Sequence, residues 1–271
     1  MKILLTGVTG YIAQRLLPVL LQEGYEVVCC VRDKNRFSKK KYQTSNLSVI
    51  EADFLNGESL KNIPNDIDVA YYLIHSMSTQ SGDFGNLEEI CATNFKNRIE
   101  QTRARQVIYL SGISNADELS KHLSSRKNVE TILADSNVSL TTLKAGIIVG
   151  SGSASFEIIR DLVEKLPFMI APRWLNTKCQ PIAIRNVVEY LVGVIGKIET
   201  YNKSYDIGGP DILTYKEMLL RFAKIRGLKR RIVIVPVMTP KLSSYWLYFI
   251  TATSYALAKN LVNSMKVEVI G

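Results

Sequence analysis

Three small residues at fixed spacing near the start of the chain could hold a phosphate group. Gly7, Gly10 and Ala13 follow the pattern Gly-x-x-Gly-x-x-Ala. Small residues at these positions allow a tight turn, a close approach of phosphate to the backbone and close helix-to-strand packing. The amides and positive dipole of a helix that begins here then favour a diphosphate. The residues expected to contact the diphosphate of a dinucleotide are Gly7, Thr9, Gly10, Tyr11 and Ile12.

The residues after the second expected strand bear on which dinucleotide binds. An acidic residue there bonds the ribose 2′-hydroxyl of NAD(H), whereas an arginine accommodates the 2′-phosphate of NADP(H). Arg32 comes first and Asp33 next, 22 and 23 residues beyond Gly10. The sequence therefore favours NADP(H) as cofactor and leaves NAD(H) open, with Asp33 turned towards the ribose as the alternative.

Three further residues follow expected strands and could reach the cofactor. Asp53 and Phe54, after the third strand, could bond the adenine amino group and flank its ring, or Asp53 could be a turn or capping residue. His75 follows the fourth strand, at the carboxyl edge where ligands bind in open α/β sheets. We expect His75 on the nicotinamide side, with loop capping as the alternative.

The elements that must position these residues alternate between β-rich apolar runs and amphipathic segments, a pattern typical of βαβ units. We expect an α/β fold, with a Rossmann-type doubly wound parallel sheet in residues 1–150. Residues 151–271, with helices at 184–195 and 215–225, form a smaller substrate-covering lobe interleaved with the Rossmann core. The expected strands of the first domain are Lys2–Leu5, Tyr25–Val31, Leu47–Glu51, Val69–Ile74, Gln106–Leu110 and Ser139–Ala145.

Composition and charge limit the classes of function. The 271 residues are 46% hydrophobic and carry 34 lysines and arginines against 25 acids, which suits a globular protein with an anionic ligand. The basic clusters lack interleaved aromatic residues, so nucleic-acid binding is not expected. Four cysteines without metal-ligand spacing and no secretory signal suggest the cytoplasm and no metal site.

The stretch Ser243–Val262 is rich in aromatic and apolar residues, yet too polar for a membrane span. Packing on the smaller lobe is the expected role, and docking to a membrane or a protein partner is the alternative. Homodimerisation also stays open.

Beside the glycine turn, several stretches resemble the short-chain dehydrogenase/reductase superfamily, and within it the atypical, NmrA-like group related to extended sugar-nucleotide epimerases. They include Tyr-Tyr-Leu-Ile-His-Ser-Met at 71–77, Tyr-Leu-Ser-Gly at 109–112 and Cys-Gln-Pro-Ile at 179–182. The resemblance spans essentially the whole chain. It implies an NAD(P)-binding Rossmann fold with Leu73 and Ile74 beside the cofactor. Larger members continue into a further domain, so the resemblance leaves open whether Gly271 is a natural terminus.

The resemblance also implies candidate catalytic residues. Enzymes of the superfamily use a serine to orient the substrate carbonyl and a Tyr-x-x-x-Lys pair to transfer the proton. Ser111 matches the serine, but His122 and Arg126 occupy the tyrosine and lysine positions. The imidazole of His122 can donate a proton, and the alternatives are a ligand contact without proton transfer or a place on the helix surface. Arginine stays charged and would hold the ribose or a substrate anion. Lys144 is a weaker candidate for contact with the substrate.

Two functions are compatible with these residues. One is an NADP(H)-dependent oxidoreductase that acts on a small organic substrate with a non-standard proton donor. The other is a catalytically inactive NADP(H)-sensing or scaffold protein, of which the missing Tyr/Lys pair is the signature. A nucleotide-sugar epimerase ranks last because it depends on that pair, and the sequence defines neither the substrate nor the direction of hydride transfer.

Overall fold

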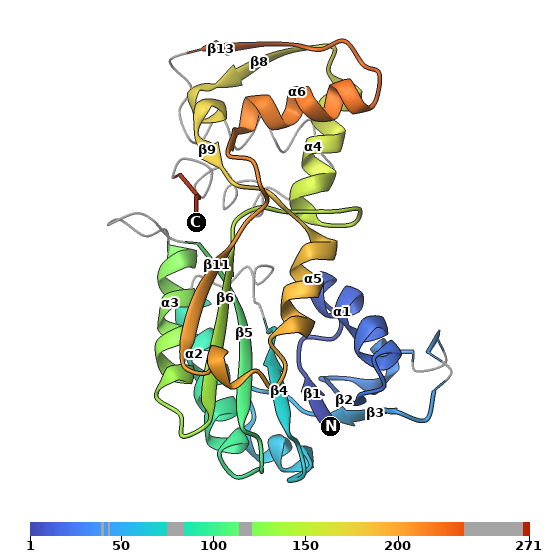
Figure 1. Ribbon diagram of the computed structural model, residues 1–271, viewed down its shortest axis with the longest axis vertical. Coiled ribbons are helices and arrows are strands. Elements are labelled where there is room, and N and C mark those ends of the chain that lie inside the picture. Colours follow the sequence, from blue (N-terminus) through green and yellow to red (C-terminus); the bar gives the residue numbers. More distant parts are fainter. Residues whose placement is uncertain (39–40, 43, 75–83, 114–120, 236–267) are drawn as a thin grey trace. The chain divides into compact units, whose positions relative to one another are not determined.

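The computed structural model describes residues 1–38, 41–42, 44–74, 84–113, 121–235 and 268–271. The chain divides into two compact units, each assembled from three segments (Figure 1). The first unit contains Met1–Gly112, Leu123–Lys144 and Ile184–Asp206. The second contains Ile113–His122, Ala145–Ala183 and Ile207–Gly271.

The first unit is built around a seven-stranded sheet in the order β11-β6-β5-β4-β1-β2-β3. The registered pairs from β5 through β4, β1 and β2 to β3 are all parallel. Because the order reverses between β1 and β4, the sheet is doubly wound and its ligand crevice is expected where these strands end. The expected fold class is confirmed. The strands are β1 (Lys2–Leu5), β2 (Glu26–Val31), β3 (Leu47–Glu51), β4 (Val69–Tyr72), β5 (Gln106–Gly112), β6 (Ser139–Ala145) and β11 (Lys203–Ile207).

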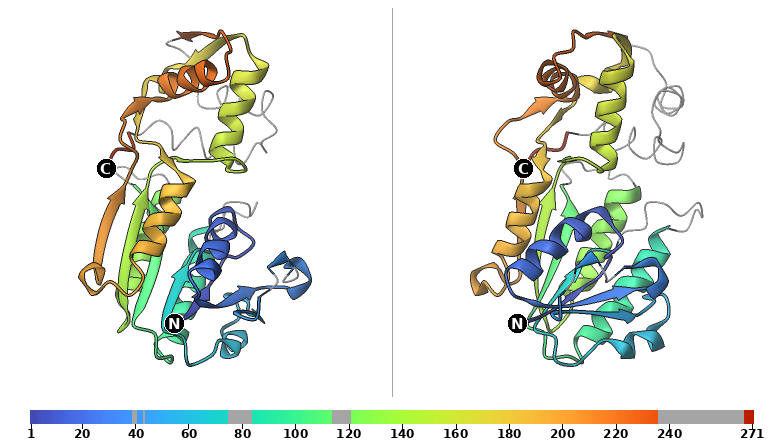
Figure 2. Two further views of the ribbon diagram at one scale, coloured as in Figure 1. Left: turned by 45° about the vertical axis from the view of Figure 1, so that its right-hand side comes forward. Right: turned by 90° about the vertical axis from the view of Figure 1, so that its right-hand side faces the viewer.

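Helices cover both faces of this sheet, which explains why its strands are almost continuously apolar. In Figure 2, α1 and α5 lie together on one face, and α2 and α3 lie on the other. Consecutive residues of β4 serve the two faces: the Tyr71 hydroxyl donates to Leu191 O of α5 at 2.8 Å, and the Tyr72 ring packs on Phe95 of α2. The helices are α1 (Tyr11–Gln22), α2 (Phe84–Ile99), α3 (Lys121–Ala134) and α5 (Ile184–Gly193), with short 3-10 turns η1 (Lys34–Arg36), η3 (Gly57–Asn62) and η5 (Ile198–Thr200).

The second unit packs two helices, α4 (Ala154–Lys165) and α6 (Tyr215–Ile225), around an apolar core of its own. Side chains cap both helices. The Ser153 hydroxyl accepts from Phe156 N at 3.2 Å, and Thr214 forms a capping box with Glu217. Three two-stranded ladders and a 3-10 turn complete the unit: β7 (Ile148–Val149) with β10 (Ile182–Ala183), β9 (Lys178–Cys179) with β12 (Leu213–Thr214), β8 (Phe168–Pro172) with β13 (Arg231–Val235), and η4 (Arg173–Asn176).

Most expected element boundaries agree with the structure. The strand expected at Val69–Ile74 ends earlier, at Tyr72, and the one expected at Gln106–Leu110 continues to Gly112. None of the helices in the described ranges is long and apolar enough to cross a membrane. The stretch Ser243–Val262 lies outside those ranges.

Candidate dinucleotide site

The glycine turn joins β1 to α1 and lies directly against the backbone that follows β4. Gly7 has a φ of 65°, and a Cβ atom built on it would lie 2.3 Å from the carbonyl oxygen of Leu73. The Gly10 amide donates to Gly7 O at 2.8 Å and closes the turn. A side chain at position 7 would therefore meet both backbone strain and a backbone clash.

Thr6 fixes the spacing between the ends of β1 and β4. Its buried hydroxyl donates to Tyr71 O at 2.8 Å and accepts from Leu73 N at 3.0 Å. Because the Leu73 amide bonds to the Thr6 side chain and not to the backbone of a neighbouring strand, β4 ends at Tyr72. Sequence reasoning assigned Thr6 no role beyond the turn, because its two partners lie more than sixty residues away in the chain.

The first turn of α1 is arranged to receive an anion. Gly10 is the N-cap, no side chain caps this end, and the first turn contains no acidic residue. The leading amides of a helix have no partner within the helix, and the helix dipole adds positive potential there. Thr9 and Gly10 are exposed, while Tyr11 and Ile12 are half-buried. The chemistry of this turn fits a diphosphate, although its contacts with these residues stay predictions.

Arg32 and Asp33 follow β2 and differ in what they can offer a ligand. The Asp33 carboxylate accepts from Asn35 N at 2.9 Å and begins η1. Arg32 is exposed, and no ion pair of its guanidinium occurs among the described residues. Lys34 and Arg36 are also exposed and add positive charge. The arrangement leaves cations at the end of β2, with the neighbouring carboxylate engaged in a turn.

Asp53 and Phe54 follow β3, where both have structural roles. Asp53 Oδ1 accepts from Leu55 N at 3.1 Å, and its backbone amide donates to Ser59 Oγ at 2.8 Å. Phe54 is 7% exposed and packs on Phe95 with ring centroids 6.1 Å apart. Their contacts with adenine stay predictions, and the turn that Asp53 forms is the alternative role that its sequence position allows.

Leu73 and Ile74 lie beside the glycine turn, as the close approach of Leu73 O to Gly7 requires. Both are half-buried. His75 lies outside the described residues, so its expected place on the nicotinamide side stays a prediction.

Ser111, near the end of β5, is 4% exposed and belongs to a small hydrogen-bonded group. Its hydroxyl hydrogen-bonds the phenol oxygen of Tyr109, whose own hydroxyl donates to Arg126 O at 3.3 Å. Burial raises the pKa of Tyr109, and the nearby Arg126 charge and the Ser111 hydrogen bond oppose that rise. The phenol therefore stays protonated at neutral pH and can hydrogen-bond Ser111.

Arg126 offers an unused donor beside this group. Its Nε atom is buried and has no hydrogen-bond partner in the part of the chain that the structure describes. A buried N–H of this kind is rare in proteins and is available to a ligand. Sequence reasoning identified Ser111 and Arg126 but missed Tyr109, although residues two apart on a strand face the same side of the sheet.

The contacts of the described residues give neither His122 nor Lys144 a role in ligand binding. His122 is the second residue of α3, one turn before Arg126, and its side chain lies outside the description. Lys144 Nζ pairs with Glu130 Oε1 at 3.2 Å, so its charge is already balanced within the first unit.

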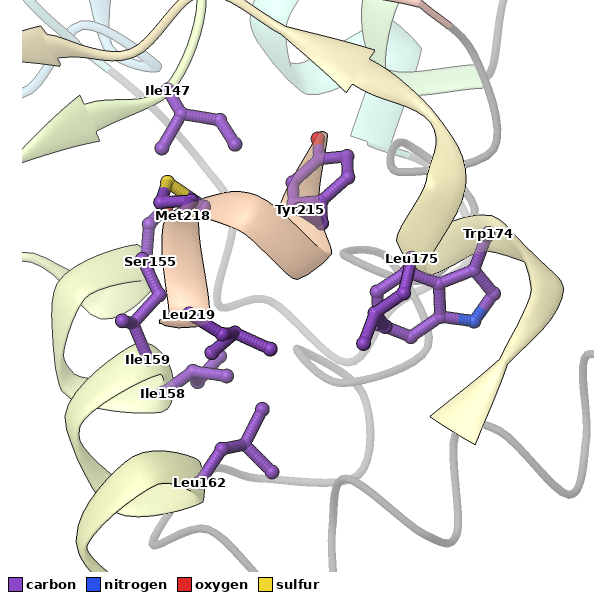
Figure 3. Close-up of a pocket in the computed structure, with 10 residues that line it drawn as sticks. All are labelled: Ile147, Ser155, Ile158, Ile159, Leu162, Trp174, Leu175, Tyr215, Met218 and Leu219. Carbon is purple, nitrogen blue, oxygen red and sulfur yellow. The ribbon is translucent and has the colours of Figure 1, made fainter. Parts of the chain in front are cut away.

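The second unit contains an apolar pocket, which we call the α4–α6 pocket (Figure 3). It encloses about 360 Å³ of empty space, part of which is open to solvent. Its lining side chains come from α4, from α6, from η4 and from the residue before β7. They are Ser155, Ile158, Ile159, Leu162, Tyr215, Met218, Leu219, Trp174, Leu175 and Ile147.

A family of NAD(P)H-binding proteins matches residues 7–152, the part of the chain that carries the glycine turn, Arg32, Ser111 and Arg126. The chain belongs to this NAD(P)H-binding family. The match confirms a dinucleotide of the NAD(P) class as the cofactor, and it does not distinguish NADP(H) from NAD(H).

Named reductases and epimerases are among the proteins to which this chain is similar. Divinyl chlorophyllide a 8-vinyl-reductase of Arabidopsis thaliana is 21% identical over a 257-residue alignment that covers 87% of this chain. The chain spans 60% of the length of this curated relative.

Two solved structures are similar over almost the whole chain. Triphenylmethane reductase of Citrobacter sp., complexed with NADP(H), has a TM-score of 0.79 at 14% identity and covers 100% of this chain and 92% of its own. UDP-glucuronic acid 4-epimerase of Bacillus cereus, in complex with NAD, has a TM-score of 0.69 at 17% identity and covers 98% and 96%. These similarities confirm the Rossmann fold that the resemblance to short-chain dehydrogenases/reductases implied. The fold alone decides neither the reaction nor the cofactor.

Proposed function

We propose that the chain is an NADP(H)-dependent oxidoreductase that transfers hydride between the cofactor and a small organic molecule. The observation that carries the choice of NADP(H) is the pair after β2: Arg32 is exposed, whereas Asp33 is engaged with Asn35 N. An arginine can make charge-assisted bonds to a 2′-phosphate, whereas the Asp33 carboxylate already accepts a hydrogen bond within its own turn.

Each part of the dinucleotide has a candidate partner in the first unit. The leading amides of α1, together with Thr9 and Gly10, would hold the diphosphate, and Arg32 would hold the 2′-phosphate. When bound, the cofactor supplies or accepts a hydride at C4 of its nicotinamide ring.

Ser111 and Arg126 would then act on the substrate or on the ribose. The Ser111 hydroxyl, which hydrogen-bonds Tyr109, would contact a substrate oxygen, and Arg126 Nε would hold the ribose or an anionic group. His122 remains the candidate proton donor in this proposal, because an imidazole titrates near neutral pH.

The missing Tyr/Lys pair limits the substrate class. When hydride adds to a conjugated system such as an enone or a quinone, the electron pair moves to a distant oxygen, which water or a weak acid can protonate. Reduction of an isolated ketone instead needs a proton donor at the carbonyl itself. The names of the Arabidopsis and Citrobacter proteins, both reductases, support oxidoreductase chemistry over the sensor alternative.

The test measures cofactor binding and turnover separately. Calorimetry with NADPH and NADH should give tighter binding of NADPH, and Arg32→Ala should remove that preference. An absorbance screen with aldehydes, ketones, enones and quinones should then detect oxidation of NADPH. Tight NADPH binding without oxidation by any acceptor class would favour the sensor alternative, and no dinucleotide binding would reject both.

A further inference from the structure

A two-stranded sheet of the second unit has apolar side chains on both of its faces. Its strands β8 and β13 are parallel, with Phe168 opposite Arg231 and Ile170 opposite Val233. We propose that the outer face of this sheet, together with the basic residues beside it, docks on a membrane surface that contains anionic lipids. This surface lies wholly in the second unit, so its docking is independent of the proposed function.

The inner face of the sheet belongs to the core of the second unit, where Met169 and Ile232 are buried. Successive side chains of a strand point to opposite faces, so Phe168, Ile170 and Val233 point outwards. These three side chains are 52%, 51% and 48% exposed. We call them the β8–β13 face, and the two strands that carry it lie side by side (Figure 1).

The β8–β13 face exposes side chains that parallel sheets normally bury. Parallel sheets occur almost only where both of their faces are covered, whereas a strand face in contact with water is normally polar. Here a phenylalanine, an isoleucine and a valine occupy neighbouring positions of the outer face. An exposed apolar group with a polar rim is typical of a surface that meets a membrane or a protein partner.

Basic residues gather where this sheet begins. Residues 221–231 contain six lysines and arginines and no acidic residue. The Arg231 amide donates to Pro167 O at 3.2 Å, and Arg230 Nη2 donates to Glu164 O at 3.3 Å. These bonds place the basic stretch beside the end of α4 and the first residue of β8, next to the β8–β13 face.

Four of the six cations have no acidic partner in the part of the chain that the structure describes. They are Lys224, Lys229, Arg230 and Arg231. Within those ranges, the Arg230 guanidinium bonds only to backbone carbonyl oxygens, which do not cancel its charge. The other two cations, Arg221 and Arg226, are paired with Asp211 and Glu164. The rim of the β8–β13 face therefore has an excess of positive charge.

Apolar side chains beside unpaired cations fit the surface of an anionic bilayer. Phenylalanine, isoleucine and valine side chains can enter the boundary between headgroups and acyl chains, while lysine and arginine bind the negative headgroups. A nucleic acid would satisfy the cations through its phosphates, but it has no apolar phase for isoleucine and valine. Charge and apolar exposure together therefore favour a lipid surface.

Sedimentation of the full chain with vesicles tests this choice of partner. The protein should bind vesicles in which about one lipid in three is phosphatidylglycerol, and should bind pure phosphatidylcholine vesicles at least about tenfold more weakly. Binding to the anionic vesicles should fall as salt rises, because exposed charges are then screened. Equal binding to both vesicles would overturn the proposal. Binding to neither would leave a protein as the partner and would also overturn it.

Charge reversal tests whether the rim makes the contact. Lys229→Glu combined with Arg231→Glu should weaken binding to the anionic vesicles at least about tenfold. The matched control is Lys197→Glu combined with Lys203→Glu, which changes the net charge equally at exposed positions of the first unit. Its binding should stay within about threefold of the unaltered protein. An equal loss in both variants, at unchanged thermal midpoints, would show that only net charge matters and would refute the assignment.

A fluorescent label tests whether the β8–β13 face enters the bilayer. The four cysteines of the chain are buried, so Ile170→Cys adds an exposed thiol for an environment-sensitive fluorophore. Its emission should shift to shorter wavelength with anionic vesicles, whereas a label on Ile198→Cys, at an exposed position of the first unit, should not shift.

Two outcomes of the labelling experiment would contradict the proposal. Unchanged emission at position 170 in vesicle-bound protein would assign binding to another part of the chain, such as Ser243–Val262. A shift that depends on protein concentration without vesicles would assign the β8–β13 face to contact with a second copy of the chain.

Discussion

Substitution of Gly7 by alanine tests whether the glycine turn has the geometry that cofactor binding requires. The new Cβ would lie 2.3 Å from Leu73 O and 2.8 Å from Leu73 C, so the backbone after β4 must move. The positive φ of 65° adds its own penalty. A left-handed conformation costs a non-glycine residue about 1–2 kcal/mol. Overpacking in a well-packed region costs about 1–3 kcal/mol.

Gly24→Ala separates these two contributions. Gly24 lies two residues beyond the last residue of α1 and has a φ of 80°, and a Cβ there meets nothing within 4 Å. We expect Gly24→Ala to lower the free energy of unfolding only by the conformational cost, which is about 1–2 kcal/mol. Gly7→Ala should lower the free energy of unfolding by a total of about 2–5 kcal/mol, which is the sum of the conformational and packing costs.

Urea denaturation followed by fluorescence and circular dichroism measures the stability of both variants, and calorimetry measures NADPH binding. Gly7→Ala should also weaken NADPH binding at least about tenfold, because its amides no longer present the same turn to the diphosphate. Gly24→Ala should bind NADPH as the unaltered protein does. The reasoning fails if the two variants have the same stability and the same affinity for NADPH.

Three further predictions concern the cofactor preference, the serine and the thiols. Arg32→Ala should raise the Kd for NADPH about 10- to 100-fold, the loss of a charge-assisted contact, and leave the Kd for NADH unchanged in the same titration. Ser111→Ala should lower kcat by about 100-fold at an unchanged Kd for NADPH, and equal kcat in both proteins would remove Ser111 from the mechanism. Burial raises the pKa of Cys29 to about 12 and that of Cys91 to about 11, so neither thiol should react with Ellman's reagent in native protein at pH 7.5. Since the unfolded thiols ionise first, the contribution of these thiols to the free energy of unfolding should be constant below about pH 8.5 and fall as the pH rises towards 11. Rapid thiol labelling of the native protein would contradict the burial.

The sequence predicted those features of the fold that depend on local patterns. Continuous apolar runs located the strands of the parallel sheet. The glycine turn was predictable for the same reason, because small residues at this spacing between a strand and a helix are typical of a turn that receives a diphosphate.

Features that depend on contacts between distant segments were not predictable. The Thr6 hydroxyl bridges to β4, Tyr109 hydrogen-bonds Ser111, and Lys144 pairs with Glu130, although nothing in the local sequence of these residues marks a partner. The α4–α6 pocket likewise combines side chains from four separate stretches. Such arrangements depend on how distant segments come together in the fold. The hydrophobic periodicity and the residue spacing of the sequence do not specify which side chains then meet.

Isotope transfer is the most direct test of hydride transfer by this protein. NADPH deuterated at C4 would be incubated with the protein and dimethylnaphthoquinone under anaerobic conditions, and the loss of label from the cofactor would be followed by mass spectrometry. Hydride moved to a quinone oxygen exchanges with water, so a conjugated enone that retains label on carbon would be run in parallel. The account predicts that deuterium leaves NADPH with both acceptors and appears on carbon in the reduced enone. Bound NADPH that keeps its deuterium with every acceptor tested would contradict the oxidoreductase assignment.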